Sequence, residues 1–187
     1  MDYKEQYKHR TSLYKGTFLD VYEDTVILPD TREASRIIVD HVGGAAVCAF
    51  TPEGQVILVK QYRYAAQTVT LEIPAGKKDA RGEDGRLRAE MELAEETGYT
   101  SNRWVSLGSV MGAIGYGTEV VDLYAAFDCR LNGQGQRLDA GEFVDVVTLP
   151  LETFEAMIYN DEIIDGKTII AFLKAQKKMS EFAGKVL

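Results

Sequence analysis

Three glutamates in the middle of the chain, Glu92, Glu95 and Glu96, have the spacing i, i+3 and i+4. On an α-helix this spacing places the three carboxylates on one side, about one turn apart, where they repel one another unless cations or solvent relieve the charge. Magnesium prefers oxygen ligands and binds through one or two carboxylates together with waters and substrate phosphates. The spacing therefore fits a divalent-cation site, but solvated acidic helix faces are also common, and spacing alone leaves both interpretations open.

The helix that carries these glutamates is predicted from Glu83 to Thr97. Leu87, Met91 and Ala94 recur at i, i+4 and i+7, which predicts that they form its apolar face. Gly98 follows directly and predicts the end of the helix, because glycine readily adopts the left-handed conformation found there.

Strands are predicted on both sides of this helix from short apolar or alternating segments bounded by turn residues. Those before the helix are 14–28, 35–42, 43–50, 55–64 and 68–74. Those after it are 104–111, 119–127 and 143–150. Two loops separate the later strands, glycine-rich at 112–118 and polar at 130–142. Helices are predicted at 151–158 and at 167–184, the latter with Ile170, Leu173 and Lys177 marking its apolar and polar faces.

Composition and charge exclude several classes of protein. A chain of 187 residues, 45% hydrophobic and 27% charged, is expected to fold as a compact globular protein. A net charge of −8 disfavours a protein that holds nucleic acid through its phosphates. Cys48 and Cys129 lie in apolar runs without metal-ligand spacing, which predicts buried thiols. The sequence has no apolar leader and no apolar run near the roughly 20 residues that span a bilayer, so we expect a cytoplasmic protein with no membrane partner.

The run from Gly76 to Tyr99 resembles the Nudix box, which reads Gly, five residues, Glu, seven residues, Arg-Glu, aliphatic, any, Glu-Glu, any, Gly, apolar. The matching residues are Gly76, Glu83, Glu92, Leu93, Glu95, Glu96, Gly98 and Tyr99. The segments LEIPAGK and VKQYRY and the glycine-rich loop ending in Glu119 are similar to the ADP-ribose pyrophosphatase branch of the Nudix hydrolases. The resemblance covers roughly residues 43–172.

This resemblance implies an α+β protein with an α/β/α sandwich, in which helices flank a mixed β-sheet. Residues 43–187 would form the Nudix domain, and residues 1–42 an N-terminal antiparallel β-sheet extension. By the same resemblance we expect a homodimer with residues 14–28 near its interface. The implied activity is Mg²⁺-dependent hydrolysis of a nucleoside diphosphate sugar, foremost ADP-ribose to AMP and ribose 5-phosphate, with Mn²⁺ as an alternative ion.

The metal site that the resemblance implies has four members. Glu92 and Glu96 are the expected principal ligands, and the carbonyl oxygen of Ala75 is a further one. Glu95 is expected to act as an auxiliary ligand or to hold the attacking water.

The expected general base lies in the polar loop at 130–142. Glu142 matches the position of the loop glutamate that serves as base in this branch, and Glu119, Glu83 and Asp139 are its substitutes. A glutamate in that place can equally do no more than solvate the turn.

Substrate contacts are expected from three places. Arg63 resembles the arginine that this branch places near the diphosphate, although a surface salt bridge explains it equally well. Gly115 and Tyr116 are expected to line the sugar site, because a glycine-rich loop lets backbone approach a ligand, although a packed loop aromatic explains Tyr116 equally well. Glu119, at the end of that loop, is expected to join them.

The box departs from its pattern in two places. Six residues, not five, separate Gly76 from Glu83. Met91 stands where the family has an arginine, and its thioether makes no ion pair with a carboxylate. The nearby arginines that are candidates to supply the missing charge are Arg81, Arg86 and Arg88.

Two other functions remain open from the sequence. The box specifies cleavage of a phosphoanhydride and not the groups on either side, so GDP-mannose or a dinucleoside polyphosphate is an alternative substrate. A Nudix-like module that binds a nucleotide sugar without cleaving it is the alternative of a different class, motivated by Met91 and the longer loop.

Overall fold

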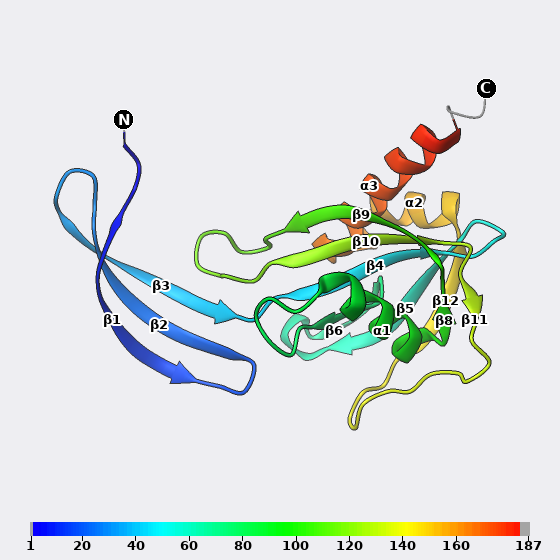
Figure 1. Cartoon of the computed structure of the whole chain (residues 1–187), viewed down its shortest axis with the longest axis horizontal. Helices are drawn as coiled ribbons and strands as arrows, with labels where there is room; N and C mark the ends of the chain where they lie inside the picture. The colour runs from blue at the N-terminus through cyan, green and yellow to red at the C-terminus, as the bar shows by residue number, and fades with distance from the viewer. Residues whose placement is uncertain (1, 184–187) are drawn as a thin grey trace.

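A narrow three-stranded sheet extends from one end of a larger sheet-and-helix body (Figure 1). The computed structural model describes residues 2–183. The extension, here called the arm, consists of β1 (Gln6–Lys15), β2 (Leu19–Ile27) and β3 (Glu33–His41). Its strands are antiparallel in the order β1-β2-β3, and β3 leads through Gly43 into the first strand of the body. The predicted N-terminal antiparallel sheet is therefore confirmed.

The prediction of a single strand over residues 14–28 is wrong, because the chain reverses within it. Lys15 ends β1, and Gly16 donates its backbone N–H to the carbonyl of Leu19 in a tight turn. A Cβ on Gly16 would lie 2.6 Å from that carbonyl oxygen, so the turn requires glycine. Strand β1 was missed because all ten of its residues are exposed and show no buried face from which alternation could be recognised.

The body contains a seven-stranded mixed sheet with the central order β12-β5-β4-β10-β9. Its strands are β4 (Gly44–Phe50), β5 (Gln55–Arg63), β6 (Thr68–Glu72), β7 (Ala75–Lys77), β9 (Arg103–Val110), β10 (Val121–Phe127) and β12 (Asp145–Pro150). Strands β4 and β10 are parallel, whereas the other pairs are antiparallel. All seven residues of β4 are buried, which makes it the centre of the fold.

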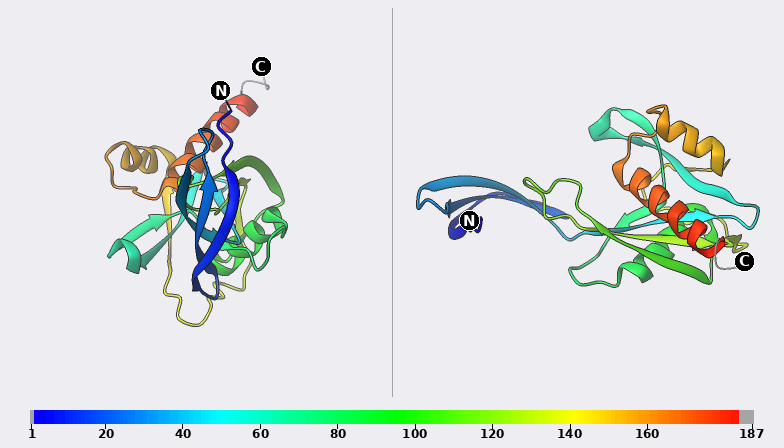
Figure 2. Two further views of the ribbon diagram at one scale, coloured as in Figure 1. Left: turned by 90° about the vertical axis from the view of Figure 1, so that its left-hand side faces the viewer. Right: turned by 90° about the horizontal axis from the view of Figure 1, so that it is seen from above.

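Helices cover both faces of this sheet (Figure 2). Alternate residues of β4 face opposite sides: Ala45, Val47 and Ala49 pack with the helix α1 (Gly85–Thr97). Ala46, Cys48 and Phe50 pack on the other face with α2 (Leu151–Tyr159) and α3 (Gly166–Ala183).

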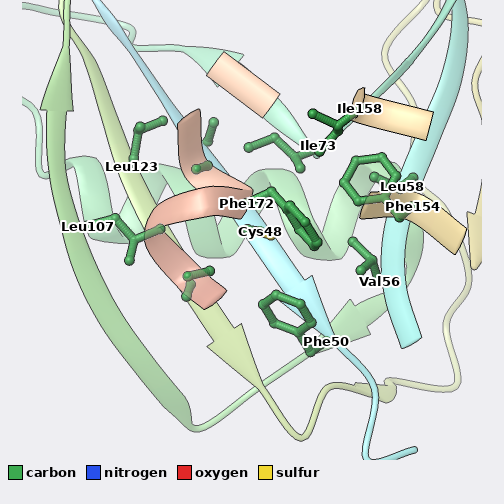
Figure 3. Packing of buried hydrophobic residues seen from close by; sticks show 14 of the residues in the cluster. Cys48, Phe50, Val56, Leu58, Ile73, Leu107, Leu123, Phe154, Ile158 and Phe172 are labelled. Carbon is green, nitrogen blue, oxygen red and sulfur yellow. The ribbon is translucent and has the colours of Figure 1, made fainter. Parts of the chain in front are cut away.

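Figure 3 shows Phe154 of α2 and Phe172 of α3 in that second core cluster. Their rings pack edge to face, with centroids 4.9 Å apart. The predicted α/β/α sandwich is confirmed. The two cysteines are buried free thiols, as predicted. Among residues 2–183, no helix combines the length and the apolar character needed to cross a bilayer.

The predicted faces of two helices are wrong. In α1 the buried apolar residues are Ala89 and Leu93, while Leu87 and Met91 are 53% and 38% exposed. Each pair has the spacing i, i+4, so periodicity alone did not distinguish them. The sheet-facing residue Ala89 packs in a cluster with the small side chains of β4, which explains why the smaller pair lies inside.

Helix α3 shows the same effect. Ile170 and Leu173 are exposed at its surface, and Ala171, Phe172 and Ala175 are buried against the sheet instead. The last predicted residue of this helix, Gly184, lies outside the described residues.

The start of α1 decides where the first glutamate of the acidic segment lies. Asp84 is the N-cap, and its side chain accepts a hydrogen bond from the backbone N–H of Arg86. Glu83 therefore precedes the helix and belongs to the loop, rather than to the helix as predicted. Gly98 ends the helix in the left-handed conformation (φ 71°), as predicted.

Two short strands missed by the sequence analysis close the far end of α1. β8 (Tyr99–Thr100) follows the helix directly and pairs with β11 (Arg130–Leu131), inside the segment predicted as loop. This pair ties the start of the polar loop to the end of the acidic helix.

Candidate active site

A cleft of about 830 Å³ lies where α1, the start of α3, β7 and the base of the arm meet. Eight of the acidic residues lie along it: Asp79, Glu92, Glu95, Glu96, Glu119, Asp139, Glu142 and Asp165. The basic side chains along it are His41, Arg63, Lys77, Arg88, Arg137 and Lys167. Glu92, Glu95 and Glu96 thus line one cavity, which favours the divalent-cation site over a solvated acidic face.

Strand β7 fixes two of these glutamates by direct contact. The backbone N–H of Ala75 donates to Oε2 of Glu96 at 3.0 Å. The Glu92 carboxylate lies over Gly76 so closely that a Cβ there would be 1.8 Å from its Oε1. Glycine at position 76 is therefore required for Glu92 to occupy this place, and the neighbouring Ala75 contacts Glu96.

Burial makes the charged forms of these two glutamates unfavourable. Burial, opposed by Arg88 but reinforced by the charges of Glu95 and Glu142, raises the pKa of Glu92 to about 7. Burial likewise raises the pKa of Glu96 to about 8, against the hydrogen bond from Ala75. Without a bound cation, both carboxyl groups therefore keep their protons to a higher pH than an exposed glutamate does.

These residues fit a hard divalent cation. Carboxylate oxygens line the cleft beside the backbone of β7, and neither of the two buried cysteines lines it. Within residues 2–183, no three His, Cys, Asp or Glu side chains are already gathered as ligands of one ion. Magnesium does not need such a cage, because it usually combines one or two carboxylates with waters and phosphate oxygens.

The loop that carries Glu142 is fastened to the C-terminal half of α1. Arg137 donates its backbone N–H to the carbonyl of Glu95, and the amide of Gln136 donates to the carbonyls of Glu96 and Val144. Between these anchors, Glu142 accepts a hydrogen bond from the backbone N–H of Asp139 at 3.1 Å. The structure thus brings Glu142 and Asp139 to the same cleft as the glutamates of α1.

Arg63 lies in the cleft but is held by a buried carboxylate. Its Nε and a terminal nitrogen donate to the two oxygens of Glu72 at 2.8 and 2.7 Å. Burial alone raises the pKa of Glu72, but Arg63 and Lys167 outweigh it and lower the pKa to about 2. Glu72 therefore pairs with two basic side chains that line the cleft, Arg63 of β5 and Lys167 in the first turn of α3.

Lys167 was not found from the sequence. Nothing in the periodicity of α3 shows that its first turn lies at the cleft, and only the tertiary fold reveals it. Phe18 and His41 of the arm also line the cleft and were missed. Their rings pack edge to face, with centroids 6.0 Å apart.

The two residues of the loop 112–118 that were predicted to contact the substrate do not share the cleft with Glu119, which follows the loop. Glu119 lines the cleft, with an oxygen 3.4 Å from Nδ1 of His41. Gly115 and Tyr116 are exposed and do not line it. The carbonyl of Tyr116 instead accepts a hydrogen bond from Val39 of β3, so this loop holds the arm to the body.

The three arginines near Met91 have different partners. Arg88 is only 7% exposed and donates to Glu83 and Asp79, with Glu92 at 3.7 Å. Arg86 pairs with Glu90 and lies over the ring of Trp104. Arg81 pairs with Asp40 at the base of the arm. Arg88 is thus the one of the three that reaches the acidic cluster.

Comparison with known proteins agrees with this fold. The NUDIX domain family model matches residues 40–172. The chain is 34% identical over 169 residues to an ADP-ribose pyrophosphatase of Bacillus subtilis (strain 168), covering 90% of this chain and 91% of the relative. It is 36% identical over 169 residues to the methanol dehydrogenase activator of Bacillus methanolicus, covering 89% and 91%. A solved structure described as an ADP compounds hydrolase superposes with a TM-score of 0.80 at 16% identity, covering 95% of each chain.

Proposed function

The chain belongs to the NUDIX family, and from this premise we propose that it is a divalent-cation-dependent phosphoanhydride hydrolase that splits nucleoside diphosphate sugars, with ADP-ribose as its foremost substrate. The observation that carries the proposal is the pair of half-buried Glu92 and buried Glu96, which lie in the cleft against Gly76 and Ala75. A relative of 34% identity bears the name ADP-ribose pyrophosphatase, which supports the choice of substrate.

The distribution of charge along the cleft suits an anionic substrate that arrives with a cation. Carboxylates of α1 line the cleft together with Arg63 of β5 and Lys167 of α3. A diphosphate lying among them would meet both cation-bound oxygens and guanidinium or ammonium donors.

We assign roles to the residues as follows. Glu92, Glu96 and the carbonyl of Ala75 would hold the cation, and Glu95 would be an auxiliary ligand. When bound, the cation supplies positive charge to the diphosphate oxygens and favours ionisation of water. Glu142 would take a proton from the water that attacks one phosphorus, while the bridging P–O bond breaks and AMP and ribose 5-phosphate form.

Glu142→Gln is expected to lower kcat by about 10²-fold with little change in KM, because the amide cannot accept the proton of the attacking water. Steady-state kinetics with ADP-ribose and Mg²⁺ measure both constants. Asp139→Asn is the matched control from the same turn, and it should leave kcat within about twofold of the original. An unchanged kcat in Glu142→Gln, together with a loss in Asp139→Asn or Glu119→Gln, would move the base to that residue.

A substrate panel tests the function itself. Purified protein is incubated with ADP-ribose, GDP-mannose or a dinucleoside polyphosphate, with Mg²⁺ or with a chelator, and the released mononucleotides are identified. We expect AMP from ADP-ribose, dependent on the ion. Faster cleavage of GDP-mannose would change the substrate, and tight binding of ADP-ribose without cleavage would favour the binding module.

Assembly and location remain predictions. We propose that residues 1–42 are an extension to a Nudix domain of residues 43–187, and that the arm lies at a homodimer interface near residues 14–28. Every residue of β1 is exposed in the single chain, including Tyr7 and Tyr14, which supports a covering partner. Light scattering after gel filtration measures the oligomeric state, and a monomeric mass would contradict the proposal. A cytoplasmic location stays a prediction.

A further inference from the structure

We propose that Arg88 performs the positioning task for which the Nudix box uses the arginine missing at position 91, and that the longer loop after Gly76 is part of the same substitution. The proposal rests on the proposed function, because it concerns how the acidic helix is prepared to hold a cation. Arg88 is a positioning residue here, since it acts through Glu92 and the loop rather than on a substrate.

The guanidinium of Arg88 connects three carboxylates. Its Nε donates to Oε1 of Glu83 at 2.8 Å, one terminal nitrogen donates to Asp79, and the other lies 3.7 Å from Oε1 of Glu92. A planar guanidinium offers donors in fixed directions, so one side chain can hold several carboxylates in a set arrangement. Arg88 thereby joins the loop before the helix to a proposed metal ligand on it.

The loop closes around the same contacts. Glu83 also accepts a hydrogen bond from the backbone N–H of Asp79 at 2.6 Å, which links the two acidic partners of Arg88 to each other. The segment between Gly76 and Glu83, one residue longer than the family pattern, includes Asp79. The same segment follows β7 directly, and β7 carries Ala75 and Gly76. Holding this loop therefore also holds the strand against which Glu92 and Glu96 are placed.

The positions of residues 88 and 91 on α1 explain why the positive charge beside Glu92 comes from residue 88. Arg88 precedes Glu92 by four residues, which places the two side chains on the same face of α1. It is 7% exposed, whereas Met91 is 38% exposed. Arg88 already supplies a positive charge beside Glu83 and Glu92, so this charge does not depend on the residue at position 91.

Three variants test this proposal in the full chain. Arg88→Met removes the guanidinium, Arg88→Lys keeps the charge without the fork of donors, and Met91→Arg restores the family residue. Arg86→Met is the matched control, because Arg86 lies on the same helix but pairs with Glu90 and Trp104 outside the cleft. The readouts are Mn²⁺ affinity by calorimetry without substrate, kcat and KM for ADP-ribose, and the melting temperature without metal.

We expect Arg88→Met to weaken Mn²⁺ binding and to lower kcat, each by roughly 10- to 100-fold, with a smaller change in KM. Arg88→Lys should recover part of both losses, and Arg86→Met should stay within about twofold of the original protein. Met91→Arg should likewise change neither quantity by more than about twofold, because the charge is already supplied.

Two results would overturn the proposal: Mn²⁺ affinity and kcat unchanged in a folded Arg88→Met protein, or a tenfold gain from Met91→Arg. If Arg88→Met does not fold, Arg88→Lys and Met91→Arg carry the test. Either full activity of Arg88→Lys or a tenfold gain from Met91→Arg would then overturn the proposal. If the original protein cleaves no nucleoside diphosphate sugar, the proposed function fails, while the Mn²⁺ titrations still decide the role of Arg88.

Discussion

Glu96→Gln is expected to lower kcat by about 10³-fold or more, because it removes one oxygen ligand and one negative charge from the proposed metal site. Its stability should stay the same or rise at pH 8. The Glu96 side chain is 6% exposed, and burial raises its pKa to about 8, so the folded state gains nothing from its charge. A glutamine oxygen can still accept the hydrogen bond from Ala75.

The measurement is kcat with saturating Mg²⁺ alongside chemical denaturation of both proteins without metal. Glu90→Gln serves as the control, because Glu90 lies on the same helix and pairs with Arg86 away from the cleft. That control should keep its activity within about twofold. Full activity in Glu96→Gln would exclude its role as a ligand, and equal losses in both variants would indicate a general disturbance of α1.

The metal-free protein is expected to lose stability as the pH rises from about 5 to above 8. The pKa values of Glu92 and Glu96 in the folded chain are about 7 and about 8, against 4.5 as their ordinary value. Between these values the folded state keeps protons that the unfolded state releases, so the free energy of unfolding falls with rising pH. Their contribution is complete below 4.5 and is lost as the pH passes 7 and 8.

Glu72 acts in the opposite direction on the acid side. Its pKa is lowered to about 2 by Arg63 and Lys167, against the effect of burial, so its contribution is present above 4.5 and disappears as the pH falls toward 2. Stability without metal should therefore be greatest in mildly acidic solution. The fall on the alkaline side should be on the order of a few kcal/mol.

Denaturation curves at several pH values with a chelator measure this dependence. Glu96→Gln should flatten the alkaline side, and Mg²⁺ at pH 8 should restore stability to the original protein, because a bound ion favours the charged carboxylates. A free energy of unfolding that is constant or rises between pH 5 and 8 in the chelated protein would contradict the pKa values of the two glutamates.

The resemblance to the Nudix box predicted the sandwich and its mixed sheet, and the spacing of the three glutamates predicted that they lie on one side of a helix. Strand segments, the glycine at the end of α1 and the i, i+3, i+4 spacing each act over a few residues. The sequence did not predict which face of α1 or α3 lies inside, since Leu87 and Ile170 satisfied helical periodicity as well as the residues that are buried.

The rest of the site depends on contacts between residues far apart in the chain. Lys167 reaches Glu72 across 95 positions, and Phe18 comes to the cleft from the turn between the first two strands. No local pattern encodes such a meeting. Arg88 is an intermediate case: its spacing to Glu92 was visible, but its burial and its pairing with Asp79 required the fold.

The anchored ends of the polar loop and its exposed tip constrain the sequence differently. Gln136 and Val144 are tied to each other and to α1, whereas Phe143 between them is 86% exposed and Ala140 is also exposed. Substitutions or insertions in this tip leave the packed interior untouched, because the anchors on either side absorb them. Changes at this tip are therefore expected to alter the surroundings of Glu142, the proposed base, with almost no effect on folding.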